Sequence, residues 1–283
     1  MAVEIVNADA LQAYRRLEIG TGKPSAVDRA QVRHHLLDIV DPDERFSAGE
    51  FARLAGRAIE EISQRGKLPV VVGGSGLYFR ALRDGLCSVP EIPSEIRAKL
   101  QANPRTDELL QELRVADPES AARCGPADRH RILRALEVFQ ATGKTLPTWW
   151  RESPPPGRPT PIVLGLTLPR PLLYDRIARR VGSMVEAGWE SEVQGLLAGG
   201  VGPEAPAFQA IGYRQWVSAA AEGRDRRQTI EEIVRETRRY AKRQETWFRK
   251  ERGITWLHST ERDDMSRVLE LLEGARAGLA SQA

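Results

Sequence analysis

The chain has 283 residues, of which 41% are hydrophobic, so it can bury one large α/β core and still form a second, smaller lobe. A formal charge of only +3 does not by itself indicate a polyanionic partner. Two cysteines, Cys87 and Cys124, and four histidines argue against a disulfide framework and a structural zinc site. No run approaches the roughly 18 apolar residues of a membrane span, and the first residues lack the pattern of a secretion signal. We therefore expect a soluble protein of the reducing cytoplasm with no membrane partner.

The N-terminal part of the chain alternates strand and helix patterns. Residues 3–6 form a short β-type run, and residues 48–65 carry apolar side chains at the spacing of an amphipathic helix. Residues 68–72 are typical of a buried strand, and the glycine-rich loop 73–76 and a helix-forming segment, 77–82, follow them. Strand, helix and strand in this order predict a parallel sheet and an α/β fold.

The middle of the chain has a different character. Residues 93–150 are helical in pattern and rich in Arg, Glu and Leu, without a convincing strand. A stiff proline-rich connector at 153–159 follows, and residues 161–166 return to a strand pattern. The predicted organisation is an α/β core of residues 1–92 and 159–262, a helical insertion lobe of residues 93–158, and a peripheral tail of residues 263–283.

Two lysine-bearing loops come close to the phosphate-binding pattern GxxxxGK[ST], and neither satisfies it. Gly22-Lys23-Pro24 has proline where a hydroxyl is required, and Leu17 stands in place of the first glycine. Gly143-Lys144-Thr145 has Val138 at that position and follows a helix, so we predict a helix end and turn there. The loop 73–76 has the right strand-to-helix context but no lysine, and it is either a tight turn or a place of close substrate approach.

A carboxylate follows the first predicted strand. Asp9 stands at the carboxyl end of this strand, where open α/β sheets bind ligands. A single aspartate at such a place is as often the N-cap of a helix as a catalytic base. Both interpretations stay open at this point.

Basic residues concentrate on two predicted helices. A helix from about 229 to 252 carries eight basic and three acidic residues between 235 and 252, with Tyr240 and Trp247 as candidate stacking groups. Arg131 and Arg134 share one face of a second helix-forming segment, residues 128–137. From charge alone, each face could bind phosphates or be a solvated helix surface.

A series of motifs stands in order along the chain. The motifs are Asn7-Ala8-Asp9-Ala10-Leu11-Gln12-Ala13-Tyr14 with Ile19-Gly20-Thr21-Gly22-Lys23-Pro24; His34-His35-Leu36 with Asp38; Val72-Gly73-Gly74-Ser75-Gly76-Leu77-Tyr78; Arg131-Ile132-Leu133-Arg134-Ala135-Leu136-Glu137; Ala210-Ile211-Gly212-Tyr213-Arg214; and Tyr240-Ala241-Lys242-Arg243-Gln244-Glu245-Thr246-Trp247-Phe248-Arg249. In this order they resemble the tRNA dimethylallyltransferases, also called tRNA isopentenyltransferases, from residue 3 to about residue 257. The resemblance implies a P-loop NTPase-like α/β core of parallel strands with an inserted helical lobe.

The resemblance also implies a reaction. In this family the exocyclic N6 amine of the adenosine just 3′ of the anticodon attacks the first carbon of dimethylallyl diphosphate, and diphosphate leaves with the help of Mg²⁺. The implied partners are therefore tRNA, through its anticodon stem-loop, and dimethylallyl diphosphate. A nucleotide-binding type of core and a monomer are expected, and none of this chain's own residues is assigned as a metal ligand.

Site residues follow from the matching positions. Asp9 corresponds to the carboxylate that accepts the amine proton, and Ser75 stands where relatives usually have threonine and keeps the hydroxyl. Arg214 corresponds to a diphosphate-binding residue. The positions that match tRNA contacts are Asp9, Ala10, Leu11, Gln12, Arg97, His130, Arg131, Ile132, Leu133, Arg134, Gln209, Ala210, Ile211, Gly212, Tyr213, Arg214, Lys242, Arg243, Gln244, Glu245, Thr246, Trp247, Phe248 and Arg249.

The departure from the family is at the front of the sequence. Relatives carry a strand, a glycine-rich phosphate loop and a helix before the segment that matches residues 3–9, whereas two residues precede Val3 here. We expect that the gene start is misplaced or the sequence is a fragment, and that the 283 residues alone are nearly inactive. The absent strand would be central, so its neighbours should show unpaired backbone groups and exposed apolar side chains.

Two readings from other classes remain open. A non-catalytic tRNA-binding module would keep the basic faces without the chemistry. A small-molecule kinase-like phosphotransferase would use Arg176, Arg179 and Arg180 to clamp phosphates, although the tRNA motifs have no place in it.

Overall fold

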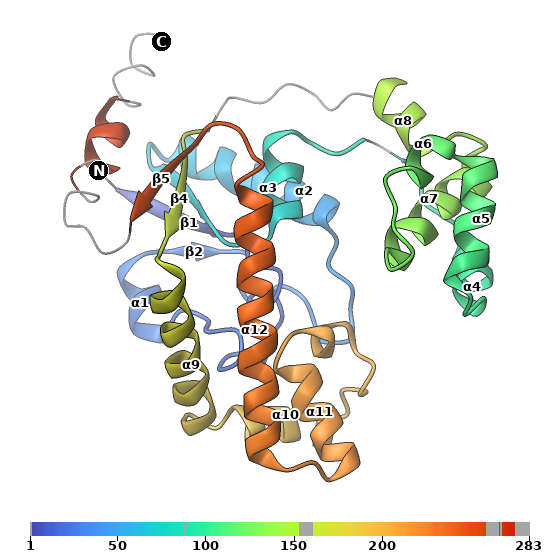
Figure 1. Ribbon diagram of the computed structural model, residues 1–283. Helices are drawn as coiled ribbons and strands as arrows, with labels where there is room; N and C mark the ends of the chain where they lie inside the picture. Colours follow the sequence, from blue (N-terminus) through green and yellow to red (C-terminus); the bar gives the residue numbers. More distant parts are fainter. Residues whose placement is uncertain (1, 88, 153–160, 259–265, 267, 275–283) are drawn as a thin grey trace. The chain divides into compact units, whose positions relative to one another are not determined.

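The computed structural model describes residues 2–87, 89–152, 161–258, 266 and 268–274. The chain divides into two compact units, one of Met1–Arg83 with Pro159–Ala283 and one of Asp84–Arg158 (Figure 1). The predicted helical lobe of residues 93–158 falls within the second unit. The predicted connector 153–159 and most of the predicted tail 263–283 lie outside the described residues.

The strands of the first unit are all parallel, so the predicted α/β fold is confirmed. Strand β1 (Val3–Asn7) lies between β2 (His34–His35) and β3 (Leu68–Val72), and its residues pair in register with β3 from Val3–Leu68 to Asn7–Val72. Strand β4 (Val163–Thr167) pairs with β5 (Ile254–His258) in a separate two-stranded sheet. The strand pattern predicted at residues 161–166 corresponds to β4, and its described partner is β5, not a strand of the three-stranded sheet.

The free edges of the two sheets carry apolar side chains that face solvent. Val71 and Val72 of β3 are 41% and 52% exposed, and Leu166 of β4 is 73% exposed. Buried parallel sheets rarely leave valine and leucine so accessible. These side chains leave apolar surface accessible at the described edges of both sheets.

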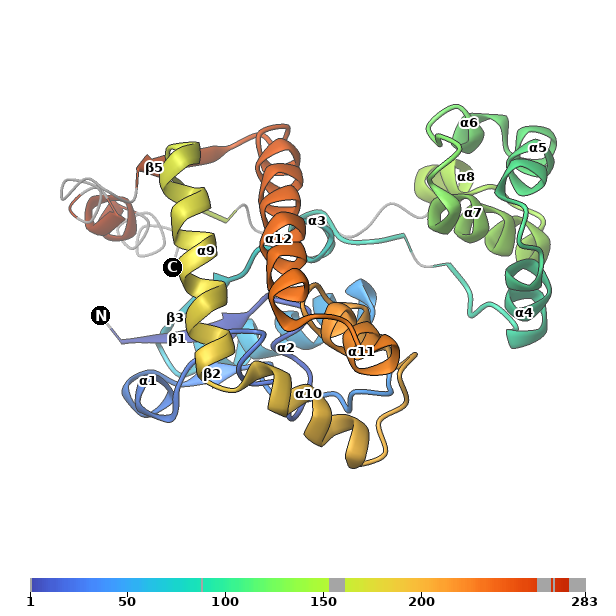
Figure 2. The ribbon, with the colours of Figure 1, turned by 60° about the horizontal axis from the view of Figure 1, so that its bottom comes forward.

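Helices surround the strands of this unit. They are α1 (Ala26–Gln31), α2 (Ala48–Gln64), α3 (Gly76–Arg83), α9 (Arg170–Glu186), α10 (Trp189–Ala198), α11 (Tyr213–Glu222) and α12 (Arg226–Phe248), with a 3-10 turn, η1, at Pro206–Gln209. Helix α2 matches its apolar pattern and begins at a capping box between Ser47 and Glu50. Helix α9 begins at Arg170, and Pro171 fits its first turn. Helices α9 and α12 lie side by side in both views (Figures 1 and 2).

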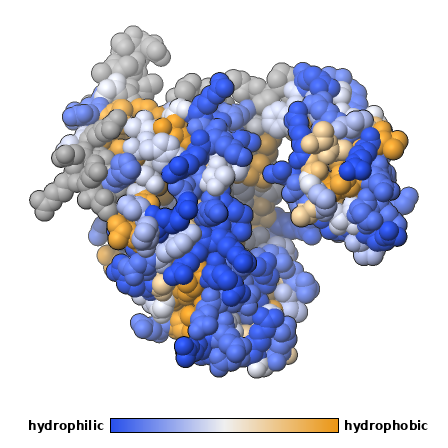
Figure 3. All heavy atoms as spheres, viewed as in Figure 1, coloured by the Kyte–Doolittle hydropathy of each residue, from blue (hydrophilic) through white to orange (hydrophobic). Residues whose placement is uncertain are grey.

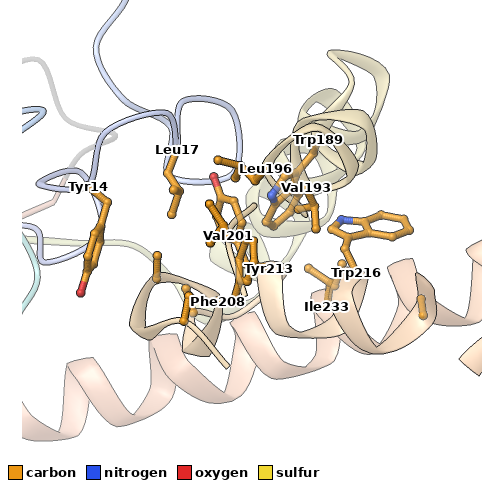
Figure 4. Close-up of a cluster of buried hydrophobic side chains, with 14 of the residues drawn as sticks. Tyr14, Leu17, Trp189, Val193, Leu196, Val201, Phe208, Tyr213, Trp216 and Ile233 are labelled. Atoms are coloured by element: carbon orange, nitrogen blue, oxygen red, sulfur yellow. The ribbon is translucent and has the colours of Figure 1, made fainter. Parts of the chain in front are cut away.

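Two hydrophobic clusters hold the first unit together. One joins the segment after β1 to α9, α10, α11 and α12, and Figure 4 shows Leu17, Trp189, Tyr213, Trp216 and Ile233 within it. The other packs β1 on α2 and α3. Because the larger cluster gathers residues far apart in the sequence, the chain after β1 is fixed by elements more than 150 positions later.

A buried carboxylate ties β1 to its neighbours. Glu4 is 1% exposed, and its oxygens accept from His35 Nε2 at 2.6 Å, Arg65 Nη2 at 2.8 Å and Lys67 Nζ at 2.9 Å. The hydrogen bond from Arg65, followed by those from Lys67 and His35, outweighs burial and holds the pKa of Glu4 well below its usual range. A carboxylate with a lowered folded-state pKa stabilises the fold above its unfolded pKa and loses that contribution as the pH falls through the folded value.

We therefore expect Glu4→Gln to lower the stability of the protein most at neutral pH. Since the unfolded pKa of glutamate is about 4.3, the gap between the parent and Glu4→Gln should stay constant from pH 7 to about pH 5 and then narrow as the pH falls further. Urea midpoints measured over this range test the expectation. Glu60→Gln, on the exposed face of α2, is the matched control. A gap that widens on acidification would contradict the assigned role of Glu4.

The second unit is a set of short helices around its own core. They are α4 (Ser94–Ala102), α5 (Thr106–Ala116), α6 (Pro118–Ala121), α7 (Arg129–Thr142) and α8 (Leu146–Glu152). Leu109, Leu113, Ile132 and Leu136 are buried at its centre. Gly143 caps α7 with φ +68°, which confirms the predicted helix end. None of the described helices combines the length and the apolar character needed to cross a bilayer.

Candidate active site

Asp9 is presented by a tight turn at the carboxyl end of β1. The Asn7 side chain bridges this turn, accepting from Asp9 N at 3.1 Å and donating to Leu36 O at 3.0 Å. Asp9 Oδ1 accepts the Leu11 N–H at 2.8 Å, and among the described residues Oδ2 has no hydrogen-bond partner. One oxygen thus orients the carboxylate while the other remains available to a substrate. The turn contact explains why Asp9 is not the side-chain cap of a described helix.

Ser75 lies beside Asp9. The backbone of Ala8 continues the ladder to β3 through its N–H, which donates to Val72 O at 2.7 Å. The next turn of chain places Ala10 N 3.3 Å from Ser75 Oγ, so this hydroxyl oxygen accepts from the segment that carries the carboxylate. A Cβ added at Gly73 would overlap the Ala8 backbone, so the glycine allows the loop after β3 to approach the segment after β1.

Helix α12 covers the glycine-rich loop. Gln244 Nε2 donates to Gly74 O at 2.8 Å, and the Trp247 indole packs where a side chain at position 76 would stand. Burial, followed by the nearby Asp9 carboxylate, raises the pKa of Tyr240, which places this phenol within electrostatic reach of Asp9. The structure therefore brings Asp9, Ser75, Tyr240 and Gln244 together from three segments of the sequence.

Gln12 reaches away from this turn toward the loop that follows. Its Nε2 donates to Thr21 O and Gly22 O, each at 3.3 Å. Thr21 Oγ1 donates to Leu17 O at 2.8 Å and closes the same loop from within. Gln12, one of the positions that match tRNA contacts, is thus oriented by backbone carbonyls of residues 21 and 22.

Lys23, in the first of the two lysine-bearing loops, is an internal ion-pair partner. Its side chain is fully buried, and Nζ donates to Tyr14 O at 2.8 Å, Glu18 Oε1 at 2.9 Å and Asp38 Oδ1 at 2.6 Å. Burial tends to raise the pKa of Asp38, but the hydrogen bonds and charges of Lys23 and Arg29 outweigh it and lower the pKa. All three printed contacts of the Lys23 ammonium group are internal, which agrees with the prediction that this loop is not a phosphate cradle.

Lys23→Met is expected to destabilise the fold without weakening diphosphate binding. Three hydrogen bonds of a buried charge are lost, and we expect a decrease of about 2 kcal/mol in the free energy of unfolding. Urea unfolding and the affinity for diphosphate would be measured together. Lys144→Met is the control, because Lys144 pairs with half-exposed Glu152 and should change stability by less than about 0.5 kcal/mol. Weaker diphosphate binding at unchanged stability would contradict this interpretation.

The motif of residues 210–214 is mostly internal. Ala210, Gly212 and Tyr213 are buried, whereas Gln209 and Arg214 are exposed. The Tyr213 hydroxyl donates to Glu192 Oε1 at 2.6 Å, and burial, followed by the Glu192 charge, raises the pKa of this phenol. Of this motif, the exposed side chains of Gln209 and Arg214 are those free to reach a ligand.

Helix α12 has the basic face that its sequence indicates. Arg235, Arg239, Lys242, Arg243 and Arg249 are exposed on it, and Figure 3 shows a hydrophilic strip along its length. Beside α9, a shallow groove is lined by the following residues: Tyr174, Ile230, Glu231, Val234, Arg235, Arg238, Arg239 and Lys242. Arg239 and Arg249 pair with Glu236 and Glu245 on the same helix. The remaining cations leave this face positive.

The second unit has a smaller basic face on α7. His130 and Arg131 are exposed, while Ile132 is buried in the core of that unit. Arg97 Nε and Arg134 Nη1 each lie 3.6 Å from an oxygen of buried Glu137. The carboxylate orients both arginines and neutralises part of their charge. The predicted contacts of these residues with tRNA stay predictions.

Sequence reasoning missed one residue that this geometry makes important. Glu192 accepts three backbone N–H groups of the loop after β1 as well as the Tyr213 hydroxyl. An acidic residue in the first turn of a helix is usually assigned to the helix dipole, so its sequence offers no separate signal. Among the described residues, no cluster of three His, Cys, Asp or Glu side chains could hold a metal ion.

Comparisons with known proteins agree with this architecture. The model of the IPP transferase family matches residues 12–251. The tRNA dimethylallyltransferase 1 of Syntrophotalea carbinolica is 44% identical over 279 residues, which is 96% of this chain and 88% of the relative. The tRNA dimethylallyltransferase 1 of Citrifermentans bemidjiense is 47% identical over 255 residues, or 90% of this chain and 83% of the relative.

Solved structures of tRNA-modifying transferases are also similar to this chain. The full-length tRNA isopentenylpyrophosphate transferase from Bacillus halodurans is 34% identical, with a TM-score of 0.68 over 99% of this chain and 89% of that one. A eukaryotic dimethylallyltransferase acting on tRNA is 27% identical, with a TM-score of 0.77 over 90% of this chain and 67% of that one. The parallel strands and the helical unit, together with these matches, identify an α/β transferase. The chain belongs to the IPP transferase family.

Proposed function

We propose that this protein transfers a dimethylallyl group from dimethylallyl diphosphate to N6 of the adenosine just 3′ of the anticodon in tRNA. The names of its relatives support transfer of a dimethylallyl group to tRNA. The observation that carries the proposal is the carboxylate of Asp9, held by Leu11 N through one oxygen and open at the other. A positioned, ionised carboxylate at the end of a parallel strand suits proton removal from a weakly nucleophilic amine.

The chemical step has a simple balance. A bond forms between N6 of the adenine and the first carbon of the dimethylallyl group, while the bond from this carbon to the diphosphate oxygen breaks. The amine proton passes to Asp9 Oδ2, and the electron pair leaves with diphosphate. Ser75 Oγ and the Tyr240 phenol lie near Asp9 and can hydrogen-bond the flipped-out base.

The leaving diphosphate needs positive charge. Arg214 is exposed and is our candidate for binding it. We propose Mg²⁺ as the second source of charge, since it neutralises diphosphate oxygens and keeps several waters. We propose that the ion is held mainly through substrate and water, and among the described residues no group of three His, Cys, Asp or Glu side chains could hold it.

For the RNA, we propose binding through phosphates and a separate reading of one base. The exposed cations of α12 would contact phosphates of the anticodon stem-loop, and the predicted contacts on α7 of the second unit would add to them. Single-stranded loops are recognised by bases that are splayed out and stacked. We also propose that the protein acts as a monomer in the cytoplasm.

A direct assay tests the proposed function. The chain, joined to the strand, phosphate loop and helix that precede this region in a relative, would be incubated with dimethylallyl diphosphate and an anticodon stem-loop RNA. Digestion and mass spectrometry should detect dimethylallyl-adenosine only when adenosine stands 3′ of the anticodon. Prenylation of the guanosine variant at an equal rate, or of neither RNA, would refute the proposal.

The two alternatives are weaker in light of the site. A non-catalytic tRNA-binding module gives no reason for an oriented carboxylate with an open oxygen at Asp9. A kinase-like phosphotransferase needs a phosphate-binding loop. The lysine of the loop at Lys23 is instead paired with carboxylates of the protein. Asp9→Ala that leaves the function in cells unchanged would favour the non-catalytic alternative.

The polypeptide of residues 1–283 by itself is proposed to transfer the group very slowly. Neither lysine-bearing loop offers a free lysine to a diphosphate, because Lys23 is buried and Lys144, just after α7, pairs with Glu152 at the end of α8.

A further inference from the structure

Glu192 joins two motifs that lie far apart in the sequence. It stands in the first turn of α10, and its Oε2 accepts the N–H groups of Glu18 at 2.9 Å and Ile19 at 2.8 Å. Its Oε1 accepts the Tyr213 hydroxyl at 2.6 Å and lies 3.5 Å from Gly20 N. Figure 4 shows the Tyr213 hydroxyl pointing toward the loop that carries Leu17. One carboxylate therefore holds three successive backbone donors and one phenol.

The loop held by Glu192 is the same one that orients Gln12. Within three residues of the Glu192 contacts, the carbonyls of Thr21 and Gly22 accept from Gln12 Nε2. A continuous series of hydrogen bonds thus runs from Tyr213 through Glu192 and the loop backbone to Gln12. Gln12 lies three residues after Asp9 in the sequence, on the segment that would receive the acceptor base.

The packing around this series leaves the loop little freedom. The Trp189 indole fills the space that a side chain would need at Gly20 or at Gly212. Gly212 has φ +91°, which favours glycine in any case. The Gly212 N–H is held by Gln215 Oε1 at 2.7 Å. The indole of Trp189 and the carboxylate of Glu192 therefore restrain the same loop from neighbouring positions of α10.

We propose that Glu192 is a positioning residue for recognition of the acceptor adenine. It fixes the loop 18–22, and the carbonyls of this loop set the orientation of the Gln12 amide. The proposal rests on the proposed function, because it takes the extruded adenosine as the group that Gln12 contacts. It gives the internal Tyr213 a role through Glu192 instead of a direct contact with RNA.

Binding measurements test the proposal without requiring turnover. The affinity of the 283-residue chain would be measured for two anticodon stem-loops, one with adenosine and one with an abasic site 3′ of the anticodon. The ratio of the two affinities reports the base, while the abasic RNA reports phosphate contacts alone. Glu192→Gln should reduce the ratio about tenfold, equivalent to roughly 1.4 kcal/mol, and leave the abasic affinity unchanged.

Controls separate positioning from folding. Glu190→Gln on the same helix loses only a pair with Arg226 and should keep the ratio of the parent. Tyr213→Phe removes one donor to Glu192 and should reduce the affinity ratio by about threefold. This variant provides the test if Glu192→Gln does not fold. Gln12→Ala combined with Glu192→Gln should be no worse than Gln12→Ala alone, because both act through one side chain.

Two results would overturn the inference. A folded Glu192→Gln variant with an unchanged ratio would show that the loop does not depend on the carboxylate. Equal weakening for both RNAs would assign Glu192 to general stability. If the unaltered chain binds both RNAs equally, the acceptor site of the proposed function fails, and the inference fails with it.

Discussion

Asp9→Asn is expected to slow prenyl transfer by about 10²–10⁴-fold, the range for loss of a positioned general base. Asparagine keeps the shape of the side chain and an oxygen that can accept from Leu11 N, so the turn after β1 should persist. Its amide cannot take the proton from the adenine amine. The affinity for the stem-loop RNA should therefore stay close to that of the parent, and the loss should fall on the single-turnover rate.

The measurement compares this rate with RNA affinity in the chain extended by the relative's N-terminal segment. Asp43→Asn is the matched control, since Asp43 is an exposed aspartate in the loop before α2. A rate within threefold of the parent would remove Asp9 from the chemistry. A rate that recovers steadily with rising pH in Asp9→Asn would instead indicate direct reaction with solvent base.

A large change in the rate of prenyl transfer is also expected when an added strand covers the open edge of β3. Residues 1–283 alone are expected to react at least about a hundredfold more slowly than the same residues preceded by a relative's strand, phosphate loop and helix. The added strand would pair with β3, covering Val71 and Val72, and its loop would supply backbone N–H groups and a lysine to the diphosphate. The extended chain should also unfold at a higher temperature, because apolar surface is buried.

An extension whose loop lysine is replaced by alanine is the matched control. It should recover the thermal stability but not the rate, since the strand is present and the cradle is incomplete. Equal rates for the extended and unextended chains would show that the described residues bind diphosphate by themselves. A rate restored by the alanine-bearing extension would show that the strand alone is what the active site needs.

The sequence predicted most local elements of the α/β unit. The apolar spacing of residues 48–65 identifies α2 within one residue, and the run at 68–72 identifies β3. Short α1 was missed because it buries no residue and so has no apolar stripe. These signals are local, and they can be recognised from the spacing of apolar side chains along the sequence.

The arrangement around the site depends on contacts that spacing does not contain. Nothing near Lys23 in sequence indicates that Asp38, at φ +57°, closes over its ammonium group. Likewise, the motif around Tyr213 suggested a direct contact with RNA, while the structure buries the ring against a carboxylate 21 positions earlier. Asp9 and Ser75 were predicted from the motifs, and their proximity to each other agrees with the shared edge of β1 and β3.

The contact of Trp189 with Gly20 and Gly212 has a consequence for sequence drift. Both glycines face the same indole, so a larger residue at either position is tolerable only after the ring becomes smaller. A smaller ring would in turn leave a hole beneath Tyr213 and Leu17. These three positions therefore form one inherited unit, and in related proteins a change at one should be found together with changes at the others.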